Sequence, residues 1–190
     1  MSIDVRPASV FEDVRAVIGP KSPTSNVCFC LSYRIPSKLN NSLRGPERGA
    51  YVERLCQATP APGVLAYDGD TPVGWAAVAP RTETTFAKNR KIPHVDELPV
   101  WSLWCIRVRP GHRGEGISHA LIAGAVEFAR ENGGPVVEAY PLDNGDSKVD
   151  LTMAYAGIRK NFEHAGFTKA ADTTSTLAGH PRILMRLDLR

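Results

Sequence analysis

The 190-residue sequence contains no apolar run that reaches the roughly 18 residues a membrane-spanning helix needs. Its first ten residues, MSIDVRPASV, also lack the charged and then apolar segments of a signal peptide. These two absences predict a soluble cytoplasmic protein. In such a compartment the four cysteines are expected to stay reduced and not to pair.

Strong charge is missing as well. The formal net charge is only +3, and nucleic-acid binding would call for a clustered basic stripe that is not seen. With 43% hydrophobic and 23% charged residues, the composition is that of an ordinary globular protein, and we expect one domain spanning residues 1–190. Neither nucleic acid nor a membrane is an expected partner.

A zinc site is another feature that the sequence does not support. Cys28 and Cys30 are separated by one residue, but no second Cys/His pair has the spacing needed to complete four ligands. Packing in a core or in the wall of a pocket is therefore preferred over metal binding, and no metal is predicted.

The most informative stretch runs from residue 100 to residue 130. Residues 100–108 are mostly apolar, β-branched or aromatic, which is typical of a strand buried on both faces. Pro110 and Gly111 end that strand, and Gly114 and Gly116 follow. The next apolar residues recur at helical spacing: Ile117, Leu121, Ile122, Ala125, Val126 and Ala129. The order is strand, glycine-rich turn, helix.

This order suits a phosphate. The first turn of a helix presents unpaired backbone N–H groups and the positive end of its dipole, and glycine lets a ligand approach the backbone closely. His112 and Arg113 could add positive charge beside the turn. The alternative is an ordinary strand-to-helix turn in which glycine only supplies a positive φ.

The string at 113–118, Arg-Gly-Glu-Gly-Ile-Ser, resembles the Gln/Arg-x-x-Gly-x-Gly/Ala acyl-CoA signature of the Gcn5-related N-acetyltransferases (GNAT). Ser118 stands where the family usually has Gly or Ala. The resemblance implies that acetyl-CoA binds here and that its pantetheine arm pairs with the preceding strand. The residues it assigns to the cofactor are Ile106, Arg107, Val108, Arg113, Gly114, Glu115, Gly116, Ile117, Ser118 and Phe162.

Phe162 belongs to a second, weaker match. Residues 162–167, FEHAGF, resemble the family's Tyr-x-x-x-Gly-Phe, in which many members use the tyrosine to protonate the leaving thiolate. Phenylalanine has no proton to give. Tyr155 precedes Phe162 by two turns of a helix predicted over 152–165, so it is a candidate substitute acid about 10 Å along the helix axis.

The remaining pattern agrees with an α/β (α+β) GNAT fold, in which a mixed sheet of six or seven strands splays between the fourth and fifth and about four helices flank it. We predict a strand at 3–6, a helix running from an N-cap at Ser9 to Ile18, and a helix at 46–59. Further strands are expected at 64–67, 72–79, 135–140, 167–170 and 183–189. Residues 80–99 form a long polar connection, expected to be either functional or simply a solvated face.

The resemblance also locates an acceptor site. In GNAT proteins the segment between the first two helices helps to wall that site, which here implicates Cys28, Phe29, Cys30, Tyr33 and Arg34. Some members carry a glutamate base at the position of Ser102, so no base transfers directly. Glu138 could act instead, with Tyr140 on the same strand face, or it could be a partnered structural carboxylate.

Three functions are compared. The first is an N-acetyltransferase that moves an acetyl group from acetyl-CoA to a primary amine of a small molecule or peptide. The second is a GNAT-fold acyl-CoA-binding regulatory module, which Phe162 and Ser102 favour. The third, a Rossmann dinucleotide domain, would need a third glycine where the sequence has His119. The enzyme is preferred, and a homodimer is left open.

Overall fold

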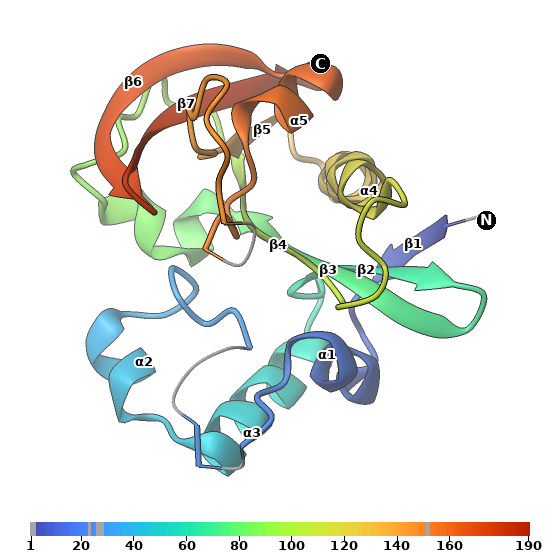
Figure 1. Cartoon of the computed structure of the whole chain (residues 1–190). Helices are drawn as coiled ribbons and strands as arrows, with labels where there is room; N and C mark the ends of the chain where they lie inside the picture. Colours follow the sequence, from blue (N-terminus) through green and yellow to red (C-terminus); the bar gives the residue numbers. More distant parts are fainter. Residues whose placement is uncertain (1–2, 23, 26–28, 151–152) are drawn as a thin grey trace.

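The computed structural model describes residues 3–22, 24–25, 29–150 and 153–190. Within these ranges seven strands join one mixed sheet in the order β1-β2-β3-β4-β5-β7-β6 (Figure 1). The strands are β1 (Ile3–Pro7), β2 (Gly63–Asp68), β3 (Thr71–Pro80), β4 (Trp101–Val108), β5 (Val136–Ala139), β6 (Thr168–Leu177) and β7 (His180–Asp188). The predicted mixed sheet is confirmed, at seven strands.

Helices cover both faces of this sheet. The helix α4 (Ile117–Glu131) packs its apolar stripe against β1–β4 on one face. On the other face lie α1 (Phe11–Ile18) and α3 (Gly45–Cys56), with α2 (Ser37–Ser42) beside them (Figure 1). A fifth helix, α5 (Arg159–His164), precedes β6. Because helices pack on both faces of the sheet, there are two main hydrophobic clusters, one on each side of β2–β4.

The predicted splay between the fourth and fifth strands is present. β4 and β5 are parallel and pair only where residues 101–103 meet residues 137–139. Beyond Leu103 the two strands separate, so the second half of β4 has no strand neighbour on that side. A bulge in β4 contributes to this separation. Trp104 is its extra residue, opposite Ala77 and Val78 of β3, and bulges bend and twist the strand that carries them.

Two helix predictions need correction. Ser9 does not cap α1, whose N-cap is Val10 without a side-chain hydrogen bond. The helix predicted over 152–165 is wrong for residues 153–158, because only α5 is helical there. Gly157 has φ +79°, and its carbonyl accepts from the Leu142 amide at 3.0 Å, while the Arg159 amide donates back to Leu142. The backbone groups of Gly157 and Arg159 are therefore paired with Leu142, as in a β-bridge, and do not form helical hydrogen bonds.

Three short elements have no counterpart in the sequence pattern. They are α2 and two 3₁₀ turns, η1 (Arg81–Glu83) and η2 (Thr85–Lys88), which occupy the start of the predicted polar connection. Phe86 of η2 is fully buried under the rings of Tyr33 and Tyr140, with ring centroids at 4.5 and 4.3 Å. The polar connection is thus partly a core element.

Candidate functional site

The turn between β4 and α4 carries the unpaired donors that its sequence predicts. Gly116 is the N-cap of α4 in the left-handed region at φ +77°, and Gly114 has φ +86°. In this fully described turn, no amide of residues 113–118 donates to a backbone carbonyl. Six N–H groups and the positive end of a 15-residue helix are therefore free for an anion.

A cavity of about 450 Å³ opens directly onto these amides. One wall is the free end of β4 together with the turn, and the other wall comes from residues 154–161. The cofactor residues predicted from the sequence that line it are Ile106, Arg107, Val108, Arg113, Gly114, Gly116, Ile117 and Ser118. The structure adds His112, His119, Ala154, Gly157, Ile158 and Asn161. The second group lies outside the signature string, and only the fold brings the last four to it.

Two predicted cofactor residues do not line the cavity. Glu115 lies within 3.5 Å of the His112 ring and is turned along the loop. Phe162 has no exposed surface; its ring packs edge-on against Phe167 at 5.2 Å and beside Gly157. Asn161, one residue earlier, faces the cavity in its place.

The edge of β4 beside this cavity already makes one backbone hydrogen bond within the chain. The amide of Ile106, predicted to face a thioester carbonyl, donates to the backbone carbonyl of Tyr155 at 2.7 Å. Residues 154–157 thus lie against the part of β4 that β5 leaves open. That amide reaches a ligand only when Tyr155 releases it.

Tyr155 stands between two cavities. Its neighbours Ala154 and Gly157 line the cavity at the turn, whereas Tyr155 itself lines a second cavity of about 420 Å³. The other residues of that second cavity are Ser32, Tyr33, Ile35, Ser37, Asn40, Thr85 and Asn89. Every polar side chain in this lining is uncharged.

A chain of polar groups supports the Tyr155 phenol. The Tyr33 phenol lies near enough to influence its pKa, and the Tyr33 oxygen accepts from Nη1 of the buried Arg182 at 3.0 Å. The guanidinium of Arg107 lies 5.7 Å from the Tyr155 ring centroid. Burial, with Tyr33 adding to it, raises the pKa of Tyr155 to about 12, so the phenol keeps its proton at neutral pH.

The residues predicted to form the acceptor wall do not lie together in one cavity. Cys28 lies outside the described residues. Tyr33 lines the second cavity, while Phe29 is buried against Phe11 with ring centroids 6.1 Å apart. Arg34 donates to the Pro62 carbonyl and stacks over Trp104 at 4.8 Å, and burial lowers the pKa of Arg34 to about 10.

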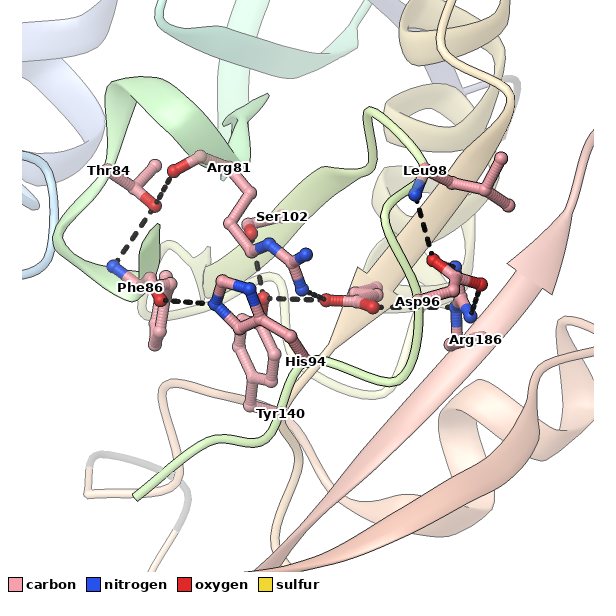
Figure 2. A network of polar contacts seen from close by, with 10 residues as sticks. Arg81, Thr84, Phe86, His94, Asp96, Leu98, Ser102, Tyr140 and Arg186 are labelled. Carbon is pink, nitrogen blue, oxygen red and sulfur yellow. Dashed lines mark hydrogen bonds and ion pairs between the residues drawn. The ribbon is translucent and has the colours of Figure 1, made fainter. Parts of the chain in front are cut away.

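Glu138 lies on β5, whereas Tyr140 follows the end of that strand, which is shorter than predicted; the two side chains still meet within a buried polar network (Figure 2). Glu138 has no exposed surface and lies between Arg81 at 2.8 Å and Arg186 at 3.4 Å. Tyr140 contacts both Glu138 and Ser102, at 3.3 and 2.7 Å.

Burial raises the pKa of Glu138, although both arginines act in the opposite direction. Burial likewise raises the pKa of Tyr140 well above its ordinary value. Neither residue lines the two cavities described above.

A third cavity, about 600 Å³, lies at the other end of β4. It is bordered by Arg81, His94, Trp101 and Gly133, among others, and contains none of the residues predicted from the sequence. Across the described part of the chain, no group of three or more His, Cys, Asp or Glu side chains is arranged to hold a metal ion. None of the helices described there is long and apolar enough to cross a membrane.

Comparison with known proteins agrees with this geometry. The family model described as Acetyltransferase (GNAT) family matches residues 33–148. Curated proteins provide no match. A GNAT-family structure from Desulfovibrio desulfuricans is similar over 100% of both chains, with 22% identity and a TM-score of 0.55. The yncA protein of Salmonella typhimurium, solved with its cofactor acetyl-CoA, has 16% identity and a TM-score of 0.57 over 100% of this chain and 95% of its own.

Proposed function

This chain belongs to the acetyltransferase (GNAT) family, and we propose that residues 1–190 act as one domain that moves the acetyl group of acetyl-CoA to a primary amine of a small molecule or peptide. One observation carries the proposal. Of the six residues with free amides at the start of α4, all except Glu115 line a cavity that continues along the open edge of β4. An anionic group with a long polar arm, such as a CoA thioester, matches that shape.

The residues present fit such a cofactor. The amides of 113–118 and the Arg113 side chain would hold the pyrophosphate, since glycines at 114 and 116 leave open space over the turn. Ile106, Arg107 and Val108 would offer backbone partners to the pantetheine arm, as an added strand would. When bound, the cofactor supplies an activated acetyl thioester.

Acid catalysis is assigned to Tyr155. Its phenol lies at the second cavity while its own backbone carbonyl holds the Ile106 amide, so it stands close to the position expected for the thioester. The raised pKa keeps the phenol protonated, as a donor to a departing thiolate must be. Tyr33, which accepts a hydrogen bond from Arg182, lies beside this phenol and would help to position it.

The second cavity is proposed for the acceptor. It is lined by Tyr155, whose neighbours Ala154 and Gly157 line the cofactor cavity, and by Tyr33 of the predicted wall. Glu138 is assigned a structural role, because it is buried between Arg81 and Arg186 and reaches neither cavity. The acceptor amine would then lose its proton to water.

The test is an acetylation screen. Purified protein is incubated with acetyl-CoA and a panel of primary amines, and release of free CoA thiol is followed together with the mass of each acetylated product. The proposal expects thiol release that depends on a particular amine and falls in the Tyr155→Phe variant.

A second candidate, an acyl-CoA-binding regulatory module, is favoured by Phe162, Ser102 and the engaged Ile106 amide. Tight acetyl-CoA binding without transfer to any amine in the panel would select it.

A further inference from the structure

The second cavity, at Tyr155, is bordered by two segments whose charge is all of one sign. Residues 32–40 and 85–91 contain two and three basic residues and no acidic residue, although the whole chain has similar numbers of the two, 23 and 20. The basic residues are Arg34, Lys38, Lys88, Arg90 and Lys91. Segment 153–158, which brings Tyr155 to the cavity, has no charged residue. The surroundings of this cavity are therefore locally positive.

Most of these charges are not balanced within the protein. Four of the five basic residues are exposed and take part in no ion pair of the described residues: Lys38, Lys88, Arg90 and Lys91. The first three are each adjacent in sequence to a lining residue, Ser37 or Asn89. Arg182, which donates to the Tyr33 phenol, is 1% exposed and likewise has no acidic partner in the described chain. An anion in this cavity is therefore attracted, whereas a second positive charge on a ligand is repelled.

Two lining side chains are arranged to donate hydrogen bonds. The Oδ1 atom of Asn89 accepts from the Lys91 amide at 3.0 Å, which leaves the Nδ2 group as the end that a ligand can use. The Tyr33 oxygen accepts from Arg182 at 3.0 Å, and a guanidinium has only donors, so the phenol directs its own proton elsewhere. Both groups suit a negatively charged acceptor such as a carboxylate oxygen.

The Tyr33 side chain is held firmly at this cavity. Its φ is +65°, in the left-handed region that costs a non-glycine residue about 1 kcal/mol or more and that is common at functional sites. Its ring stacks on the buried Phe86 with centroids 4.5 Å apart, and its carbonyl accepts from the Thr85 amide at 2.7 Å. Contacts with the start of the polar connection 80–99 thus fix the phenol in the lining.

We propose that the acceptor of the acetyl group is a small primary amine whose other end carries a carboxylate, held by Asn89 and Tyr33 within these positive surroundings. A volume of about 420 Å³ lies in the range of small-molecule sites. The amine end lies toward Tyr155, whose neighbours Ala154 and Gly157 line the cofactor cavity. The inference rests on the proposed acetyl transfer, because it names the acceptor of that reaction.

The chemistry remains that of acetyl transfer. A bond forms between the amine nitrogen and the acetyl carbon, and the bond from that carbon to sulfur breaks. The departing thiolate takes the phenolic proton of Tyr155, the amine gives its proton to water, and the phenol regains a proton from solvent. The carboxylate takes no part in these steps and serves only to bind and orient the acceptor.

Three four-carbon amines test the charge at the far end of the acceptor. They are 4-aminobutanoate, 4-amino-1-butanol and 1,4-diaminobutane, which end in a carboxylate, a hydroxyl and a second ammonium. Binding to the CoA-saturated wild-type protein is followed by ligand-observed NMR titration, and kcat/KM is measured with acetyl-CoA. We expect the carboxylate compound to exceed the diamine by roughly tenfold or more in both measurements, with the alcohol between them. In about 0.5 M NaCl, where the Debye length is only a few ångström, this ratio should shrink.

A charge change in the lining makes the test specific. Asn89→Asp keeps an oxygen for the Lys91 amide but replaces the donor group by a negative charge. We expect this variant to lose the preference for 4-aminobutanoate and to favour 1,4-diaminobutane. The matched control Asn41→Asp makes the same change at an exposed position of α2 outside the cavity, and it should keep the wild-type order.

This inference and the proposed acetyl transfer fail in different ways. Binding in the expected order without acetylation would support the ligand class and contradict the transfer. Acetylation with equal or reversed preference among the three amines would overturn the carboxylate site and leave the transfer intact. The carboxylate site is also overturned if none of the three amines binds, or if Asn89→Asp and Asn41→Asp show the same order.

Discussion

The backbone N–H of Ile106 donates a 2.7 Å hydrogen bond to the carbonyl of Tyr155. This contact joins the open edge of β4 to the segment that separates the two cavities. A thioester carbonyl and the Tyr155 carbonyl cannot both be the main acceptor of one short N–H bond. Binding of the thioester at the Ile106 amide, as proposed above, would therefore be coupled to the position of residues 154–157.

The first prediction concerns that amide. With the protein labelled by ¹⁵N-isoleucine and the Ile106 peak assigned through Ile106→Val, acetyl-CoA should shift the Ile106 amide further than CoA does. The reason is that only acetyl-CoA carries a thioester carbonyl, which is the group expected to compete with Tyr155 for this amide. Equal shifts with both ligands would mean that the N–H keeps its partner and does not polarise the thioester.

The second prediction concerns Tyr155. Tyr155→Phe should lower kcat by roughly 10²-fold or more, because a positioned acid is worth about that much. Since the pKa of the phenol is raised to about 12, it stays protonated up to that pH, and kcat should show no alkaline loss from this group between pH 7 and 10. Steady-state rates over that pH range check both statements.

A matched control is Tyr51→Phe, which removes a phenol from α3, outside both cavities. It should keep the wild-type kcat. Full activity in Tyr155→Phe, with chemistry rate-limiting, would leave solvent as the proton source.

The third prediction concerns Phe162. Restoring the family's tyrosine by Phe162→Tyr should not raise kcat, because Phe162 is fully buried against Phe167 and Gly157 and does not reach the cavity. An added hydroxyl without a partner in this core should cost about 1–3 kcal/mol of unfolding free energy. Urea unfolding and kcat are the two measurements. A gain in rate without loss of stability would show that the hydroxyl reaches the reacting sulfur.

The fourth prediction separates structural from catalytic roles of Glu138. Glu138→Gln should lower the unfolding free energy by roughly 3 kcal/mol, because it leaves the buried Arg81 without its counter-charge and Arg186 with Asp96 alone. The control Glu163→Gln removes an exposed partner of Arg159 and should cost less than about 1 kcal/mol. Unchanged stability together with a large fall in kcat would instead identify Glu138 as the base.

Much of the fold follows from local pattern. The glycines at 114 and 116 and the apolar stripe of α4 predict the strand, turn and helix because the signals are contiguous in sequence. The boundary of α5 does not follow, since residues 153–158 contain helix-compatible residues. The carbonyls of Tyr155 and Gly157 instead accept from Ile106 and Leu142, which lie far away in sequence.

The site is predictable to the same degree. Arg113 and Ser118 belong to a contiguous sequence motif, so they can be predicted. Asn161 and Ala154 lie far from that motif in sequence, and only the path of the chain after β5 brings them to the cavity. The sequence suggests Tyr155 as the acid because a helix over 152–165 would place it on one face with Phe162, but Tyr155 lies outside α5. It remains the candidate acid for another reason, namely its place between the two cavities.

The central claim is that the turn at 113–118 binds the phosphates of the cofactor, and titration calorimetry with CoA tests it most directly. Gly116→Asp places a carboxylate at the N-terminus of α4, where φ is +77°. Gly133→Asp makes the same change just beyond the other end of the helix, where φ is +78° and no neighbour lies within 4 Å, as at Gly116. The backbone strain is thereby matched. We expect folded Gly116→Asp to lose CoA binding and Gly133→Asp to bind like the wild type; equal affinities for the two variants would contradict the assignment.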